Sequence, residues 1–328
     1  MNDRYWADKN VLVTGCTGLL GSWMTEKLVT DEANVVGLVR DQIPKSYLYF
    51  SKTETEIIQV RGEIENYPLI ERILNEYEIE YIFHLAAQTI ISIANKNPVS
   101  TFKTNIEGTW NILEACRRNP SDVKIIVASS DKAYGTQKNL PYDEDTPLEG
   151  RHPYDVSKSC ADLLCRSYFE TYDLPVCVTR CGNIFGGGDL NFNRIVPGTI
   201  KSLIENKIPV IRSDGTYIRD YFYVRDAVNS YLCLAKELDK GKIAGEAFNF
   251  SNENPLTVLE LVNKIIQNFG SGVTPLILDS VKNEIKAQYL SSQKAKRILS
   301  WEPQYSLDTG LSETIDWYKN FFKNKLFF

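Results

Sequence analysis

Short apolar runs rich in β-branched residues alternate with amphipathic stretches of helix length, and this alternation restricts the fold more than any other feature. Strands connected by helical crossovers run parallel, with helices on both faces of the sheet. The pattern predicts an α/β fold with a doubly wound parallel sheet. The expected strands are 11–13, 35–39, 57–60, 81–86, 124–129, 176–180 and 247–251, and the expected helices are 20–29, 69–76, 99–117 and 154–171.

A glycine-rich turn directly follows the first expected strand and opens the first expected helix. Its glycines have the spacing G-x-x-G-x-x-G, which lets the backbone adopt positive φ and approach a ligand closely. The free N–H groups of a helix N-terminus attract an anion such as a pyrophosphate. We therefore expect a dinucleotide-binding (Rossmann) site that is formed by Gly15, Thr17, Gly18, Leu19, Leu20 and Gly21.

The end of the second expected strand bears on which dinucleotide binds. NAD-specific sites carry an acidic residue here for the ribose 2′-hydroxyl, but the strand ends in Val39-Arg40. Arg40 could pair with the 2′-phosphate of NADP, or it could be a solvated surface residue. Glu63, after the third strand, could accept a hydrogen bond from the adenine amino group.

The alternation weakens after residue 180, where glycine-rich and asparagine-rich turns separate shorter elements. We expect residues 1–180 to form the dinucleotide-binding domain, with a strand near 246–251 returning to it. Residues 181–328 are expected to form mainly a smaller, partly interleaved C-terminal α/β lobe.

Charge and hydropathy argue against nucleic-acid and membrane partners. Lysine and arginine total 37 against 42 acidic residues, so there is no overall positive field. Residues 1–10 do not have the pattern of a secretory leader, and no apolar run reaches the roughly 18 residues of a membrane span. The expected location is the cytoplasm.

Cysteine and histidine usage argues against metal and Ser-His-Asp chemistry. The seven cysteines are scattered through apolar runs and are interpreted as buried thiols. The two histidines, His84 and His152, have no further ligand at metal-binding spacing. We interpret His84 as a structural strand-end residue, whereas His152 lies in a loop where it could touch a ligand.

A phenol and an ammonium, Tyr154 and Lys158, are spaced to lie on one side of a helix that Pro153 can begin. A nearby cation favours the phenolate, so the pair could remove a proton from a hydroxyl group. The polar run 129–132 ends the fifth expected strand, and the carboxyl ends of parallel strands line the ligand crevice of such sheets. These residues therefore predict one reactive site.

Several motifs in order resemble the extended short-chain dehydrogenase/reductases, in the nucleotide-sugar epimerase/dehydratase branch, over essentially the whole chain. Besides the glycine turn and Y-x-x-x-K, they are HLAAQ at 84–88, NIEGT at 105–109, RCGNIFG at 180–186 and RDYFYVRD at 219–226.

The resemblance implies roles for individual residues. Ser130 and Tyr154 would contact the sugar 4-hydroxyl, Lys158 would hold the nicotinamide ribose, and Asn105 would support the site. The other residues expected at the cofactor are Ile64, Leu85, Ala86 and Ala87, and those expected at the nucleotide sugar are Gln88, Asn183, Arg194, Arg219 and Tyr289. The resemblance also implies a tightly bound and recycled NAD or NADP, a substrate-binding role for the C-terminal lobe, and a homodimer through helices 99–117 and 154–171.

Asp131 and Lys132 distinguish between the reactions of this branch. Epimerases typically carry small or apolar residues here, whereas a 4,6-dehydratase needs an additional acid and base to remove water across C5 and C6. Asp131 could protonate the leaving hydroxyl and Lys132 could act at C5, or Lys132 could orient water or stabilise an enolate. An Asp-Lys pair resembles the CDP-glucose 4,6-dehydratase subgroup, although GTYIRDY at 215–221 follows the more general pattern.

The leading hypothesis is thus an NDP-hexose 4,6-dehydratase, a carbon–oxygen lyase, with CDP-glucose as the first substrate to consider. The alternatives are a 4-epimerase, a dinucleotide-binding protein without turnover, and a net reductase.

Overall fold

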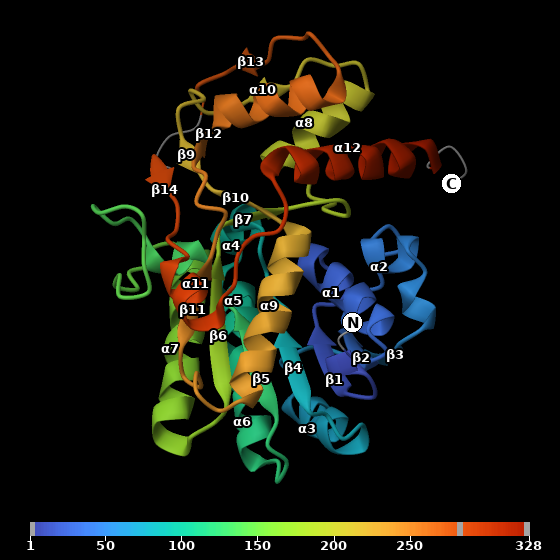
Figure 1. Ribbon diagram of the computed structural model, residues 1–328, viewed down its shortest axis with the longest axis vertical. Coiled ribbons are helices and arrows are strands. Elements are labelled where there is room, and N and C mark those ends of the chain that lie inside the picture. Colours follow the sequence, from blue (N-terminus) through green and yellow to red (C-terminus); the bar gives the residue numbers. More distant parts are fainter. Residues whose placement is uncertain (1–3, 281–284, 325–328) are drawn as a thin grey trace.

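The structure is a computed structural model that describes residues 4–280 and 285–324. Its centre is a seven-stranded sheet in which all neighbouring strands run parallel, in the order β11-β6-β5-β4-β1-β2-β3 (Figure 1). The strands are β1 (Asn10–Thr14), β2 (Asn34–Val39), β3 (Ile58–Arg61), β4 (Tyr81–His84), β5 (Lys124–Ala128), β6 (Val176–Cys181) and β11 (Ala247–Phe250). All seven predicted strands are present, which confirms the α/β fold with a parallel sheet.

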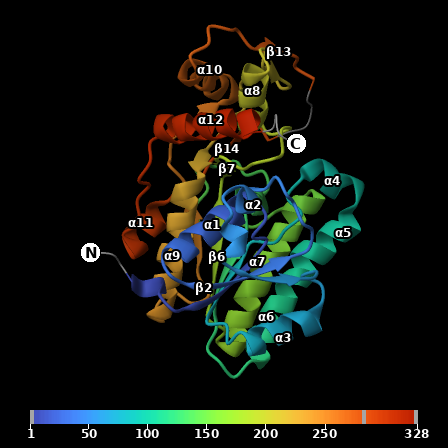
Figure 2. The same cartoon turned by 90° about the vertical axis from the view of Figure 1, so that its right-hand side faces the viewer.

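Helices cover both faces of this sheet, so it is doubly wound (Figures 1 and 2). Because successive strand residues point to opposite faces, Val11 and Val13 of β1 belong to one apolar core and Leu12 belongs to the other. The first core contains α1 (Leu19–Thr30) and α9 (Val224–Asp239), and the second contains α3 (Tyr67–Glu76), α6 (Gly108–Arg118) and α7 (Pro153–Tyr172).

The helix expected over residues 99–117 differs from the prediction. It is divided into α5 (Pro98–Phe102), a π-helical segment η3 (Lys103–Glu107) and α6, and the short helix α4 (Ile91–Lys96) precedes it. A π-helical turn inserts an extra residue, and such turns are frequent at functional sites. The inserted turn contains the buried side chain of Asn105.

Most of the chain after residue 180 forms a smaller lobe at one end of the sheet (Figures 1 and 2). Helices α8 (Ile195–Ile204), α10 (Val258–Phe269) and α12 (Leu307–Asn324) share a third apolar core. The short strands here are β7 (Asn183–Phe185), β8 (Val210–Ile211), β9 (Ile218–Arg219), β10 (Tyr221–Tyr223), β12 (Leu256–Thr257), β13 (Leu276–Ile277) and β14 (Ala287–Gln288).

Three elements after residue 180 nevertheless lie against the main sheet. They are α9, β11 and α11 (Gln293–Leu299), and α9 packs on α1, β5 and β6. The interleaving is thus more extensive than one returning strand, and the division into domains at residue 180 stays a prediction.

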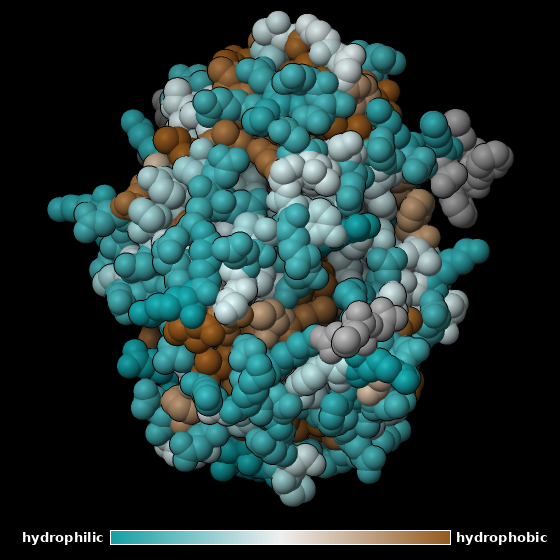
Figure 3. Space-filling model, in the orientation of Figure 1, coloured by the Kyte–Doolittle hydropathy of each residue, from teal (hydrophilic) through white to brown (hydrophobic). Residues whose placement is uncertain are grey.

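The remaining short helical segments are η1 (Arg4–Trp6), α2 (Tyr47–Phe50), η2 (Thr53–Thr55) and η4 (Asp131–Tyr134). The face in Figure 3 is covered mostly by hydrophilic side chains, with small apolar patches between them. None of the helices in the described ranges is both long and apolar enough to cross a membrane.

Candidate functional site

A cavity of about 660 Å³ lies between the carboxyl ends of the central strands and the C-terminal lobe. The main sheet contributes the turns after β1 and β4, the segment after β5 and the end of β6. The lobe contributes β7, the start of α8 and Arg219 of β9. One cavity thus brings together the glycine turn, the polar run after β5 and the start of helix α7.

The glycine turn forms one wall of this cavity and has no room for side chains. Gly15 has φ of +72°, and a Cβ atom there would lie 2.8 Å from the backbone nitrogen of Ala86. A Cβ atom on Gly21 would lie 2.1 Å from the carbonyl oxygen of Gly15. Helix α1 begins after Gly18 without a side-chain cap, so its first N–H groups are available to an anion. The predicted residues Gly15, Thr17, Gly18, Leu19, Leu20 and Gly21 all line the cavity, and the cradle fits a dinucleotide pyrophosphate.

The end of β2 carries a carboxylate that the sequence prediction did not consider. Arg40 lines the cavity, but its Nε donates to Asp41 Oδ2 at 2.7 Å, and Asp41 lines the cavity as well. Glu63 is exposed and does not line it, because Ile64 and Glu65 occupy the wall at that point. The expected contact of Glu63 with adenine therefore finds no support in this geometry.

Tyr154 and Ser130 meet in the cavity, with Lys158 on the same helical face as Tyr154. Burial is the largest influence on the pKa of Tyr154 and raises it to about 12, whereas a hydrogen bond with Ser130 opposes this rise. Lys158 Nζ donates to the carbonyl oxygen of Ala128 at 2.7 Å. Burial lowers the pKa of Lys158 to about 8. Burial thus outweighs the lowering of the Tyr154 pKa by Ser130 and by the charge of Arg194.

Asp131 and Lys132 stand beside this pair and both line the cavity. Asp131 is buried, and its Oδ1 accepts a hydrogen bond of 2.9 Å from Ser130 Oγ. The charge of Asp131 also raises the pKa of Tyr154, which shows that the two groups are close enough to interact. Ser130, Asp131, Lys132, Tyr154 and Lys158, which we call the cavity cluster, therefore lie together as the sequence predicts.

Asn105 and Gln88 lie outside the cavity and support its wall. Asn105 Oδ1 accepts from the Gln88 backbone nitrogen at 2.7 Å, and Asn105 Nδ2 donates to Ser157 Oγ of α7 at 2.9 Å. Gln88 is not part of the lining, whereas Leu85, Ala86 and Ala87 before it are. Asn105 thereby connects the turn after β4 to the helix that carries Tyr154 and Lys158.

The expected substrate residues are only partly in the cavity. Asn183, Arg194 and Arg219 line it, but Tyr289 does not. Arg194 Nη1 pairs with Asp189 Oδ2 at 3.1 Å. Arg219 directs its guanidinium to backbone carbonyls: Nη1 donates to Ile218 and Lys286, and Nη2 donates to Ile285 at 2.5 Å.

Two buried groups near the cavity cluster were not predicted. Gln288 of β14 contacts both members of the Asp131-Lys132 pair. Asp220 lies between β9 and β10, and burial, with Asp131 and Glu253 as further causes, raises its pKa to about 7. The nearest sequence signals were Tyr289, beside Gln288, and the RDYFYVRD motif that contains Asp220.

The histidines and cysteines have structural surroundings. His84 Nδ1 is 2.9 Å from Thr14 Oγ1 and Nε2 is 3.1 Å from Thr109 Oγ1, as expected for a satisfied buried histidine. His152 is exposed and does not line the cavity. The cysteines are all free thiols, and within the described ranges no cluster of three or more His, Cys, Asp or Glu residues could hold a metal.

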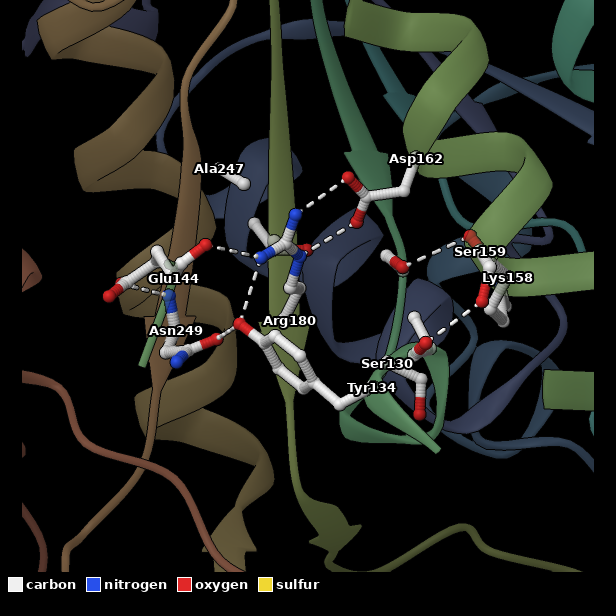
Figure 4. Close-up of polar contacts among 12 residues, drawn as sticks. Ser130, Tyr134, Glu144, Lys158, Ser159, Asp162, Arg180, Ala247 and Asn249 are labelled. Carbon is white, nitrogen blue, oxygen red and sulfur yellow. Dashed lines mark hydrogen bonds and ion pairs between the residues drawn. The ribbon is translucent and has the colours of Figure 1, made fainter. Parts of the chain in front are cut away.

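A second buried polar cluster lies beside the cavity cluster (Figure 4). Its centre is Arg180, whose Nε and Nη2 donate to the two carboxylate oxygens of Asp162, each at 2.8 Å. Nη1 donates to Tyr134 Oη at 2.8 Å, and that hydroxyl donates to Asn249 at 2.7 Å. The Glu144 carbonyl accepts a longer bond from Nη1. We call these five residues the Arg180 cluster.

Comparisons with known proteins agree with this site. The family model described as GDP-mannose 4,6 dehydratase matches residues 12–314. CDP-glucose 4,6-dehydratase from Salmonella typhimurium is 28% identical over 335 residues, with 97% of this chain and 93% of that protein covered.

Solved structures agree as well. UDP-glucose 4-epimerase from Thermotoga maritima, solved with UDP-glucose, has a TM-score of 0.86 at 27% identity and covers 95% of this chain and 99% of that one. dTDP-glucose 4,6-dehydratase from Bacillus anthracis, solved with NAD, has a TM-score of 0.83 at 28% identity, with 95% and 97% covered. The resemblance to epimerases and dehydratases of nucleotide sugars is confirmed, and the chain belongs to the GDP-mannose 4,6-dehydratase family.

Proposed function

We propose that this chain converts CDP-glucose to CDP-4-keto-6-deoxyglucose. Family membership and relatives assign it to the NAD(P)-dependent nucleotide-sugar 4,6-dehydratases, which are carbon–oxygen lyases. The observation that carries the elimination is the placement of Asp131 and Lys132 in the same cavity as Tyr154. The cytidine base is supported by the likeness to the Salmonella relative and by the Asp-Lys pair, which the sequence associates with the CDP-glucose subgroup.

The cofactor in this proposal is NAD, held tightly and recycled within each turnover. The glycine cradle, Ile64, Leu85, Ala86 and Ala87 line the part of the cavity that would hold it. Asp41 offers a carboxylate acceptor to a ribose 2′-hydroxyl and would repel a 2′-phosphate, while Arg40 is already paired with Asp41. When bound, NAD would supply a hydride acceptor for C4 of the sugar and a hydride donor for C6.

The cofactor proposal is tested by identifying the dinucleotide that the purified protein releases on gentle denaturation, by mass spectrometry. We expect NAD. In addition, Asp41→Ala should shift the binding preference toward NADP, because the repulsive carboxylate is gone. Release of NADP from the wild-type chain would overturn this part of the proposal.

The cavity cluster provides the proton transfers. Tyr154 Oη takes the proton of the C4 hydroxyl, assisted by Ser130, whose hydrogen bond favours the phenolate. At the resulting 4-keto sugar, Lys132 Nζ takes the acidified C5 proton and the C5–H electron pair forms the C5–C6 double bond. The C6–O bond breaks, and Asp131 gives its proton to the departing hydroxyl so that water leaves. The proton that was taken from C5 returns there when hydride adds to C6. The proton that Tyr154 took from the C4 hydroxyl replaces the one that Asp131 gave to the departing water, so both groups regain their starting states.

Residues on the lobe side of the cavity bind the nucleotide sugar in this proposal. Asn183, Arg194 and Arg219 line it there, and a guanidinium can bind phosphate oxygens through two parallel N–H bonds. Lys158 lines the cavity, and in this proposal it holds the nicotinamide ribose. Gln88 and Tyr289 lie outside the lining, so in this proposal they act only through neighbouring residues.

A 4-epimerase remains the second candidate because a UDP-glucose 4-epimerase is among the similar solved structures. The two reactions share the oxidation at C4 and differ in their need for Asp131. We therefore propose to incubate the protein with CDP-, dTDP-, GDP- and UDP-glucose and to assay the alkali-absorbing 4-keto-6-deoxy product.

Asp131→Asn should reduce formation of this product by roughly 100-fold or more, the scale of a general acid. Its matched control is Asp143→Asn, which changes an exposed aspartate in the loop after η4. If no nucleotide sugar loses its C6 hydroxyl, or if Asp131→Asn keeps full activity on a substrate that is only epimerised, the dehydratase assignment is wrong.

We also propose that the protein is a homodimer. Large apolar side chains are exposed on three adjacent helices: Val99 of α5 (63%), Trp110 of α6 (42%) and Leu163 of α7 (54%). Burying such a face is a common reason for self-association. Light scattering should give twice the chain mass for the wild type and a shift toward the monomer for Leu163→Glu. The expected cytoplasmic location likewise stays a prediction.

A further inference from the structure

Gln288 is a glutamine with no exposed surface that lies directly behind the Asp131-Lys132 pair. Its Nε2 donates to the backbone carbonyl of Asp131 at 2.8 Å, and its Oε1 accepts a hydrogen bond from Lys132 Nζ. It comes from β14 of the C-terminal lobe, whereas the pair follows β5 of the main sheet. A single side chain from the lobe therefore contacts both residues that distinguish elimination from epimerisation.

The strand that carries Gln288 is firmly held. Strand β14 pairs with β9 so that Gln288 lies opposite Arg219, and Ile218 N donates to Lys286 O at 2.8 Å. The guanidinium of Arg219 adds bonds to the carbonyls of Ile285 and Lys286. Beyond β14, Tyr142 N donates to the Tyr289 carbonyl at 3.0 Å. The backbone at Gln288 is thus fixed, so its amide can orient the flexible side chain of Lys132.

The chemistry of an amide suits a lysine that must lose its proton. A carboxylate partner would stabilise the ammonium form, whereas the amide oxygen accepts one N–H without adding a negative charge. The same amide donates to the Asp131 backbone, so it fixes the loop on which the proposed acid stands. A long four-carbon side chain gains reactivity from such orientation, since misplacement by about 1 Å can cost about 100-fold in rate.

We propose that Gln288 is a positioning residue for elimination, which orients Lys132 Nζ toward C5 of the sugar and fixes the backbone of Asp131. This inference rests on the proposed dehydratase function. It predicts that Gln288 affects the elimination and not the oxidation at C4 or the binding of the nucleotide sugar.

The test compares Gln288→Met, Lys132→Met and the double variant on CDP-glucose, in steady-state and single-turnover assays. Gln288→Met should lower kcat roughly 10- to 100-fold with KM unchanged, and the near-ultraviolet absorbance of reduced nicotinamide should accumulate because oxidation continues. In the Lys132→Met background the same substitution should cost clearly less than in the wild type, because only the bond to the Asp131 carbonyl remains to be lost. Equal losses in both backgrounds would show that Gln288 does not act through Lys132 and would overturn the proposal.

Two further variants keep the test decisive. Gln288→Glu preserves the shape of the side chain and should fold even if the methionine variant does not; it should slow elimination because the carboxylate holds Lys132 as an ammonium. Wild-type kcat in Gln288→Glu would refute the inference.

Gln137→Met is the matched control, since Gln137 Nε2 donates to the carbonyl of Tyr134 in the same segment without contacting Lys132. Gln137→Met should retain wild-type kcat. A loss equal to that of Gln288→Met would contradict the proposal, because it would show that Gln288 only supports the loop in general. Failure of the wild-type chain to form any 4-keto-6-deoxy product would instead refute the dehydratase proposal itself.

Discussion

Two elements, η4 and α7, contribute residues to both the cavity cluster and the Arg180 cluster, but the two clusters balance their charges differently (Figure 4). At segment η4, Ser130 lines the cavity, whereas Tyr134 accepts a hydrogen bond from Arg180. On helix α7, Lys158 lines the cavity, whereas Asp162 pairs with Arg180. In each element the two residues are one helical turn or its equivalent apart. The same two elements therefore position part of each cluster.

The Arg180 cluster is a satisfied ion pair, whereas the cavity cluster is not. Arg180 and Asp162 are 7% and 6% exposed and join through two parallel hydrogen bonds. Lys158 instead donates to the neutral carbonyl of Ala128, and burial lowers its pKa to about 8. Perturbed ionisation of this kind is typical of functional sites, and full pairing is typical of structural ones. We infer that the Arg180 cluster holds η4 and α7 in place, and these two elements carry residues of the cavity cluster.

The largest effect should come from the phenol of the cavity cluster. Tyr154→Phe should lower turnover of CDP-glucose by roughly 10²- to 10⁴-fold, because it removes the acid–base group at C4. The free energy of unfolding, measured by urea titration, should not fall. Tyr168→Phe on the same helix, whose hydroxyl contacts Glu114, is the control and should keep wild-type turnover. Wild-type turnover in Tyr154→Phe would show that the cavity cluster is not the reactive one of the two clusters.

The Arg180 cluster should show the opposite response. Asp162→Leu leaves a buried guanidinium without its carboxylate and should lower the free energy of unfolding by about 3–5 kcal/mol, while kcat per folded molecule stays unchanged. The double variant Asp162→Leu/Arg180→Met should recover most of this stability, because no buried charge remains. A loss in the double variant as large as in the single one would mean that the ion pair itself stabilises the fold.

The third prediction concerns the imidazole of His84, which is buried near Lys158 and should resist protonation. Burial, with the Lys158 charge as the second cause, lowers the pKa of His84 to about 3. Because the unfolded chain binds a proton below a pH of about 6.5 and the folded chain does not, stability should fall on acidification by up to about 1.4 kcal/mol per pH unit.

The measurement is urea unfolding between about pH 7 and about pH 4, the window in which this linkage acts. His84→Gln should lose less stability on acidification than the wild type. His152→Gln, at the exposed histidine, should keep the wild-type dependence. Parallel curves for the wild type and His84→Gln would show that His84 titrates normally in the folded protein.

The smallest expected effect is a gain of stability in an inactive variant. Because the pKa of Lys158 is lowered from 10.5 to about 8, its charge destabilises the fold below about pH 8, and this cost disappears as pH rises toward the unfolded value. Lys158→Met should therefore raise the free energy of unfolding near neutral pH by about 1–2 kcal/mol, after the lost hydrogen bond to Ala128 is counted. A decrease would show that the ammonium stabilises the fold.

The main sheet could be predicted almost completely from the sequence. Buried parallel strands are continuous apolar runs, and the seven of them are recognisable without any tertiary contact. The helix over 99–117 has the expected outer limits to within about one residue, but its π-helical turn at Asn105 was not predicted, because one inserted residue hardly changes the apolar periodicity. Helix α9 was also missed as a cover of the sheet.

Gln288 shows why part of the site could not be predicted. The sequence favoured Tyr289 as a substrate residue, but side chains alternate along a strand, and it is Gln288 that contacts Lys132. Nothing in the residues near 288 indicates a partner 156 positions away. Such a contact depends on how the lobe packs on the sheet, which local patterns do not encode.

The sequence by itself determined the glycine cradle, the sheet and the spacing of Tyr154 and Lys158, because backbone sterics and helical geometry act between residues that are neighbours in the chain. Only the tertiary structure decided that Arg40 pairs with Asp41, that Arg219 holds the carbonyls before β14, and that burial raises the pKa of Tyr154. Charge pairing, hydrogen-bond choice and desolvation depend on everything that surrounds a group in space, and most of these surroundings come from distant parts of the chain.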